Sequence, residues 1–197
     1  RDKYGDDRRT RILSTEAEEI GEDDLIPEED MVVTITRNGY AKRVPMDSYR
    51  TQKRGGKGII GASKRTEDRV EHLFVANTHD YILFFTNRGR VYRLKAYEVP
   101  QCSRTAMGTA IVNMINIEAG DVVTASVPVK DIENATGYML MATRNGEVKR
   151  VSVGEFANLR ANGLVCFDIE PEDELRWVMF SDGTQEVIMV TRSRSGR

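Results

Sequence analysis

Short apolar runs alternate along the chain with turns that contain glycine, a pattern typical of β-strands joined by tight hairpins. Each of three such runs is followed by a turn with glycine and then by a strand in which apolar and polar residues alternate. Glycine suits these turns because they need a positive φ angle, which residues with a Cβ atom resist. The three predicted hairpins cover residues 31–44, 81–94 and 138–151.

The hairpins belong to a longer internal repeat. Counted from the turn glycines Gly39, Gly89 and Gly146, position −3 is always threonine and position +4 is always arginine. A further glycine follows at +19, +19 and +17, where a third apolar run opens, and a fourth strand comes after it. Units of about 50 residues with four strands each predict an all-β protein of propeller-like blades.

The repeat divides the chain into a linker and a series of blades. Residues 1–30 are acidic and show no sustained periodicity, so we interpret them as a linker that carries the tail of a preceding domain. A β-sandwich is the alternative, but it would not repeat threonine, glycine and arginine in register. Because an open set of blades exposes strand edges, we expect an incomplete set from a larger domain. The blades are predicted at about residues 31–79, 80–136 and 137–184, with a partial fourth at 185–197.

The net charge of −2 over 197 residues conceals an uneven distribution of acidic and basic residues along the chain. Residues 1–30 hold 12 acidic and 5 basic side chains, whereas residues 37–69 hold 10 basic and 3 acidic ones. Such a separation is typical of a protein that binds a polyanion. A solvated surface loop rich in lysine and arginine is the alternative that charge alone leaves open.

A basic segment rich in glycine, Gln-Lys-Arg-Gly-Gly-Lys-Gly, occupies residues 52–58. Its glycines free the backbone, so that three cations and exposed amides can approach phosphates closely. It is not a Walker loop, because the spacing differs and no serine or threonine follows Lys57. The equivalent segments, residues 100–108 and 158–163, lack this density of charge. One loop of three is therefore specialised.

The repeated arginines at position +4 are Arg43, Arg93 and Arg150. On outward-facing strands they would place positive charge at regular intervals around a rim. The alternative is that the repeat copies a structural arginine that brackets each hairpin. The pattern alone leaves both interpretations open.

Residues 52–58 resemble the seven-residue gyrase-A box, Gln-Arg-Arg-Gly-Gly-Lys-Gly, and depart from it only at Lys53. Lysine keeps the charge there but lacks the bidentate fork of arginine. Residues 47–51, 28–34 and 3–10 also resemble the A chain of bacterial DNA gyrase, a type IIA topoisomerase. The resemblance covers essentially the whole chain.

The resemblance implies a C-terminal β-pinwheel, six-bladed in the usual family member, that wraps DNA around its rim and so gives gyrase its negative supercoiling. Residues 1–30 would then include the tail of the breakage–reunion domain. No catalytic residue and no metal ligand is expected in this segment, which is not an enzyme in isolation. The DNA-binding residues that we predict are Gln52, Lys53, Arg54, Gly55, Gly56, Lys57, Gly58, Arg43, Arg50, Arg93 and Arg150.

The implied partners are double-stranded DNA, the remainder of the gyrase A polypeptide, and the gyrase B polypeptide in an A2B2 heterotetramer. No cofactor is expected in this segment, since the ATP and magnesium of the holoenzyme bind elsewhere. We expect a cytoplasmic protein associated with the chromosome, with no membrane contact. Two alternatives are kept: the corresponding domain of topoisomerase IV, a decatenase with a degenerate box, and a blade-repeat module that binds proteins through apolar anchors.

The remaining candidates for chemistry receive structural interpretations. Cys102 and Cys166 are too few for a disulfide scaffold or a zinc site, so we expect two buried thiols. His72 and His79 lack partners at metal-ligand spacing and are predicted to lie at the surface or at strand ends. Trp177 is predicted to pack within its strand.

Overall fold

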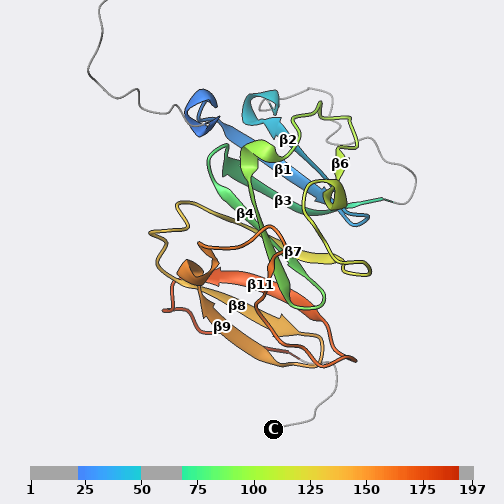
Figure 1. Cartoon of the computed structure of the whole chain (residues 1–197), viewed down its shortest axis with the longest axis vertical. Coiled ribbons are helices and arrows are strands. Elements are labelled where there is room, and N and C mark those ends of the chain that lie inside the picture. The colour runs from blue at the N-terminus through green and yellow to red at the C-terminus, as the bar shows by residue number, and fades with distance from the viewer. Residues whose placement is uncertain (1–21, 50–67, 191–197) are drawn as a thin grey trace, which may run out of the picture.

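The computed structural model describes residues 22–49 and 68–190 (Figure 1). These ranges contain eleven β-strands and five short 3-10 helices, with no α-helix among them. The all-β prediction is therefore confirmed. The 3-10 helices are η1 (Glu22–Leu25), η2 (Met46–Ser48), η3 (Ala96–Glu98), η4 (Ile111–Asn113) and η5 (Val153–Phe156).

The strands form three antiparallel sheets that lie one after another along the molecule (Figure 1). The first sheet has the order β3-β1-β2-β6, the second β10-β5-β4-β7 and the third β11-β8-β9. Hydrogen bonds do not join the first sheet to the third, so the described residues show no ring closure. The strands are β1 (Asp30–Thr36), β2 (Tyr40–Pro45), β3 (Val70–Asn77), β4 (Tyr81–Thr86), β5 (Arg90–Lys95), β6 (Thr109–Ala110), β7 (Val123–Val129), β8 (Tyr138–Thr143), β9 (Val148–Ser152), β10 (Leu164–Val165) and β11 (Leu175–Ser181).

The second and third units each donate one short strand to the sheet of the unit before it. β6 comes from the second unit of the sequence but pairs with β2 of the first, where Tyr40 faces Ala110. In the same way, β10 of the third unit pairs with β5 of the second, where Val91 faces Leu164. The apolar pattern predicted these strands but not the sheet that each one joins, because periodicity describes only the faces of a strand.

The repeated threonine and glycine have a shared structural cause at the hairpin turns. Each turn glycine has a positive φ angle, 79° at Gly39, 75° at Gly89 and 98° at Gly146, as predicted. The glycine N–H donates to the carbonyl of the threonine three residues earlier, at 3.0–3.1 Å in all three turns. The threonine hydroxyl then accepts the N–H of the residue after the glycine, at 3.0–3.3 Å. The threonine therefore closes each turn with two acceptors, its carbonyl oxygen and its hydroxyl oxygen.

The core consists of two clusters that meet at β4. Leu83 and Phe85 face the cluster shared with the third sheet, whereas Ile82 and Phe84 face the cluster shared with the first. All four side chains are fully buried because β4 is covered on both faces. This explains why its sequence is a continuous apolar run rather than an alternating one.

Lys42 on β2 is buried, with only 2% of its surface exposed. Its ammonium donates to the carbonyls of Ser103, Arg104 and Ala106, which belong to the segment that leads into β6. Burial lowers the pKa of Lys42, but the three carbonyls match the three donors of the ammonium. The lysine therefore holds this segment against the first sheet.

We expect the Lys42→Met variant to lose about 1–3 kcal/mol of unfolding free energy, because three carbonyls lose their buried donor. The matched Lys130→Met variant removes an exposed lysine and should change stability by less than about 0.5 kcal/mol. Urea denaturation followed by circular dichroism measures both. Equal stability of the two variants would show that the buried ammonium does not hold the segment.

Candidate nucleic-acid interface

The predicted box, Gln52–Gly58, and Arg50 lie outside the described residues, so their contacts with DNA stay a prediction. The flanking residues are described. The chain leaves β2 near Pro45, which faces Met31, and it returns at Val70, which faces Thr36. The two flanks of the basic segment therefore lie at opposite ends of the first sheet.

The return point is held by the tip of the first hairpin. The backbone N–H of Asn38 donates to the carboxylate of Asp68 at 3.1 Å, and that of Arg37 donates to the carbonyl of Arg69 at 2.9 Å. These bonds fix the end of the basic segment beside a hairpin tip that carries an exposed arginine, Arg37.

An aspartate supports the turn of each hairpin. In the third unit, the carboxylate of Asp173 accepts the N–H of Asn145 at 3.0 Å, and in the second, the Thr86 hydroxyl donates to Asp121 at 3.1 Å. Burial opposes the charge of Asp173, but hydrogen bonds from Thr143 and from backbone N–H groups outweigh it and lower its pKa. The sequence repeat does not reveal these aspartates, because their distance from the turn glycine differs between units.

Arg43 connects the first unit to the second. Its Nε donates to the carbonyl of Val99 at 2.6 Å, and its backbone pairs with Pro100 and Cys102 at 3.0 Å each. Burial lowers the pKa of Arg43, although Glu29 opposes the effect. The side chain is half-buried between the two units.

Arg93 makes the corresponding contact between the second and third units. Its Nη1 donates to the carbonyl of Ala157, and its Cζ lies 4.6 Å from the centre of the Tyr81 ring. Val99 and Ala157 occupy the same place, directly after the 3-10 helix of the next unit. In the first two units, the repeated arginine therefore joins the hairpin to the next unit.

Arg150 differs from the other two repeated arginines. It is exposed, and its Cζ lies 4.4 Å from the centre of the Tyr138 ring. Among the described residues, no carbonyl of a following unit accepts its guanidinium N–H groups. Arg43 and Arg93 thus have a structural role, which favours the second interpretation of the repeat, whereas phosphate contact by the three arginines stays a prediction.

Acidic side chains neutralise several other cations of the described surface. Arg90 lies 2.7 Å from Glu118, and Arg88 lies 3.3 Å from Asp121. Both Arg144 and Arg176 lie 2.9 Å from one oxygen of Glu174. Positive charge is therefore interrupted within the described residues. The exposed cations that have no acidic partner there are Arg37, Arg69, Lys130, Lys149, Arg150 and Arg160.

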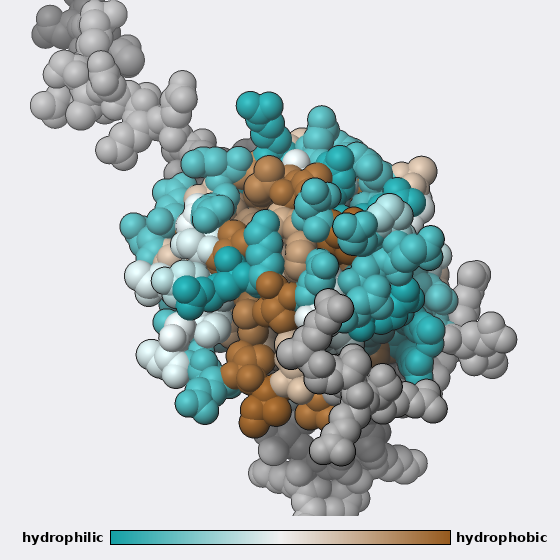
Figure 2. Space-filling model, turned by 90° about the horizontal axis from the view of Figure 1, so that it is seen from below, coloured by the Kyte–Doolittle hydropathy of each residue, from teal (hydrophilic) through white to brown (hydrophobic). Residues whose placement is uncertain are grey.

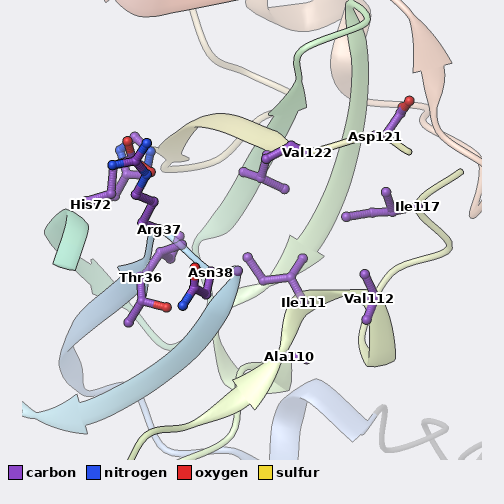
Figure 3. A pocket seen from close by; sticks show the side chains of 14 residues that line it. Thr36, Arg37, Asn38, His72, Ala110, Ile111, Val112, Ile117, Asp121 and Val122 are labelled. Atoms are coloured by element: carbon purple, nitrogen blue, oxygen red, sulfur yellow. The ribbon is translucent and has the colours of Figure 1, made fainter. Parts of the chain in front are cut away.

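A cavity of about 300 Å³ lies between the first and second sheets (Figure 3). Ile111 and Val122 are among the apolar side chains on one side, and Arg37 and His72 approach it from the first sheet. His72 lies on β3 and is half-buried rather than at the surface, and burial lowers its pKa although Glu71 opposes the effect. No group of acidic, histidine or cysteine side chains among the described residues could hold a metal ion.

The prediction for Trp177 is wrong, because 58% of its surface is exposed. β11 is an edge strand, and its register shifts between Leu175 and Trp177, which turns the indole outward. Figure 2, which views the molecule from the side of the third sheet, shows apolar surface there. Exposed apolar side chains of this unit include Val148 and Met179.

The two thiols differ in their surroundings. Cys166 is buried as predicted, and burial raises its pKa to about 12. Cys102 is only half-buried. His79 also is half-buried, and its Nε2 donates to the carbonyl of Ile26 at 2.8 Å.

Successive antiparallel blades, of which the first two accept a strand from the next unit, define a propeller-like β-domain. A family profile matches three segments of the chain, residues 30–77, 80–130 and 137–182. The chain belongs to this family, the DNA gyrase C-terminal domain, beta-propeller. The resemblance found in the sequence is confirmed.

Individual relatives agree with the family. The chain is 42% identical over 195 residues to the gyrase A polypeptide of Staphylococcus aureus (strain NCTC 8325 / PS 47), a match that covers 99% of this chain and 22% of that protein. The solved C-terminal domain of DNA topoisomerase IV matches with a TM-score of 0.66 and 31% identity, over 80% of this chain and 47% of that one. The solved DNA gyrase A C-terminal domain matches with a TM-score of 0.60 and 25% identity, over 77% and 48%.

The chain therefore spans about a fifth of the length of the curated relatives that it matches. No helix among the described residues is long and apolar enough to cross a membrane.

We expect the Arg93→Ala variant to lose about 1–3 kcal/mol of unfolding free energy, since the carbonyl of Ala157 loses its donor. Arg150→Ala removes the equivalent side chain of the third unit but only one cation–π contact, so a loss of at most about 1 kcal/mol is expected. Chemical denaturation measures both variants. A smaller effect at Arg93 than at Arg150 would contradict the connecting role.

Proposed function

We propose that this chain binds double-stranded DNA with little sequence specificity and bends it around the rim of the blades. It would act as the non-catalytic wrapping domain of a gyrase-type DNA topoisomerase. The observation that carries the proposal is the basic glycine segment, residues 52–58, in a chain of this family. Neither of its counterparts, residues 100–108 and 158–163, has the same density of charge.

The free energy needed to bend DNA determines how much binding free energy such a domain must supply. Curving 20–30 base pairs smoothly by 40–90° costs on the order of 1–6 kcal/mol. Phosphate contacts repay this cost through counterion release. The box and the exposed arginines Arg37, Arg150 and Arg160 are the cations that we assign to these contacts.

Low sequence specificity fits the described architecture. Bases are read by elements that enter a groove, such as a recognition helix. The described residues form antiparallel sheets and short 3-10 helices, with no α-helix to play this part. Phosphate contacts position DNA but carry no sequence information.

The wider assembly is part of the proposal. We assign the chain to a gyrase A polypeptide that works with gyrase B as an A2B2 heterotetramer on the chromosome, in the cytoplasm. The ATP and magnesium of that enzyme would bind outside this segment. A chiral wrap would present a nearby DNA segment in one crossing sense, so that strand passage changes the linking number in one direction.

A topoisomerase IV domain is the second candidate, because a solved domain of that enzyme matches with a TM-score of 0.66. The 42% identity to a gyrase A polypeptide and the nearly intact box favour gyrase. The exposed apolar side chains of the third unit, such as Trp177, are the observation that fits a protein-binding module. Supercoiling and decatenation assays on the full-length polypeptide with its partner separate these candidates.

A salt titration tests the phosphate contacts. We expect the affinity of the chain for duplex DNA to fall about ten-thousandfold between about 50 and 300 mM salt, as counterion release predicts for five or six phosphate contacts. Fluorescence anisotropy with a labelled duplex of unrelated sequence measures the slope. An affinity that does not change with salt would refute the phosphate contacts.

Replacing Lys53, Arg54 and Lys57 with alanine should abolish negative supercoiling by the reconstituted enzyme, because the wrap loses its most concentrated cations. Relaxation without ATP should persist, since strand cleavage lies outside this segment. The control replaces Arg104, Lys130 and Arg176, none of which is assigned to the phosphate contacts, and so removes the same charge elsewhere.

Gel assays of supercoiling and relaxation, with circular dichroism of each variant, measure the outcome. Equal loss in the control variant would show that net charge, rather than the box, supports wrapping. Loss of the folded state in the box variant would show a structural role for the loop.

A further inference from the structure

The acidic linker contacts the second unit before it enters β1. The carboxylate of Asp23, on η1, accepts the hydroxyl of Tyr97 at 2.5 Å and lies 3.7 Å from the ammonium of Lys95. The hydrogen bond from Tyr97, together with Lys95, lowers the pKa of Asp23 against the opposing effect of burial. The carboxylate is therefore charged at neutral pH.

Backbone groups of the linker extend this contact. Nε2 of His79 donates to the carbonyl of Ile26 at 2.8 Å, and the hydroxyl of Thr78 donates to that of Pro27 at 2.7 Å. The backbone of Thr78 also donates to the carbonyl of Glu29 at 2.9 Å. The linker thus contacts the second unit through Asp23, and through residues 26–29 it contacts the turn, residues 78–79, that leads into that unit.

The residues that receive the linker depart from the repeat. Counted from the turn glycine Gly89, Thr78, His79, Lys95 and Tyr97 differ from the residues at the same distances from the other two turn glycines. These residues are Glu28, Glu29, Pro45 and Asp47 around Gly39, and Ala135, Thr136, Ser152 and Gly154 around Gly146. A purely structural repeat does not explain four departures that meet at one contact. We infer that the second unit, together with the turn that leads into it, carries a surface dedicated to this segment.

This surface belongs to a cationic part of β5. The ammonium of Lys95 and the guanidinium of Arg93 lie 4.0 and 4.6 Å from the centre of the same Tyr81 ring. The Lys95 side chain is 18% exposed, and its ammonium also donates to the carbonyl of His79 at 3.1 Å. Residues 16–30 hold nine acidic side chains and no basic one, a charge density that resembles a polyphosphate.

We propose that the acidic linker and duplex DNA compete for this surface of the second unit, so that the docked linker restrains DNA binding. The inference rests on the proposed function. DNA that reaches β5 would displace Asp23 from Lys95 and release the linker from the Thr78 and His79 side of the surface. A purely structural brace would stay in place when DNA binds.

Two variants of the whole chain weaken the contact by different means. Asp23→Asn removes the charge, and Tyr97→Phe removes the hydroxyl that donates to it while leaving the net charge unchanged. Each should bind duplex DNA about two- to fivefold more tightly than the wild type at about 100 mM salt. Because both variants release the same contact, the double variant should gain less than the product of the two. The gain should shrink as salt rises.

Glu133→Gln is the matched control, since it removes one exposed acidic charge far along the chain from the linker. It should leave the affinity within about 1.5-fold of the wild type. If Glu133→Gln raises the DNA affinity as much as Asp23→Asn does, or if Tyr97→Phe does not raise it, the gain comes from net charge alone. Either result would overturn the proposal.

Hydrogen exchange of residues 22–29 gives a readout that does not require tight DNA binding. Exchange should be faster in both variants without DNA and should become faster in the wild type when a duplex is added. Unchanged exchange on saturation with DNA would show a brace rather than a competitor. If exchange shows the linker released in Asp23→Asn and yet neither protein binds DNA at low salt, the proposed function itself fails.

Discussion

Each of the first two sheets of this protein depends on the sequence unit that follows it. β6 and β10 complete sheets to which their own units do not belong, and a cation of the receiving sheet holds the donated segment in place. Lys42 and Arg43 bind carbonyls of the second unit, and Arg93 binds a carbonyl of the third. Because contacts run between neighbours, the stability of each unit depends on the next, as in other repeat proteins.

This dependence divides the positive charge of the surface into two classes. Cations that connect units are half-buried or buried and donate to carbonyls. Their donors are therefore less available to bind a phosphate or another anion. Cations of the hairpin tips are largely offset by acids such as Asp121 and Glu174. Many cations of the described scaffold therefore already have a carbonyl or acidic partner. The scaffold uses the repeated arginines Arg43 and Arg93 for assembly, whereas the sequence concentrates three other cations in residues 52–58.

Sequence reasoning was strongest where the cause is local. The hairpins, the positive φ angles of their glycines and the family follow from patterns within a few residues, and the structure confirms them. It was wrong for Trp177, since a strand pattern does not reveal that β11 lies at an edge with a shifted register. It also left the role of Arg43 and Arg93 undecided, because their carbonyl partners lie 56 and 64 residues away.

By itself, the sequence determined an all-β repeat with a basic loop and an acidic linker, because apolar period, turn chemistry and charge are properties of neighbouring residues. Only the tertiary structure decided which sheet each strand completes, which arginines are occupied, and where the linker rests. These outcomes depend on hydrogen bonds between residues far apart in the chain. Asp23 meets Tyr97 across 74 positions, for example. A repeat shows that equivalent residues exist in each unit, but contact between units requires the geometry that places them side by side.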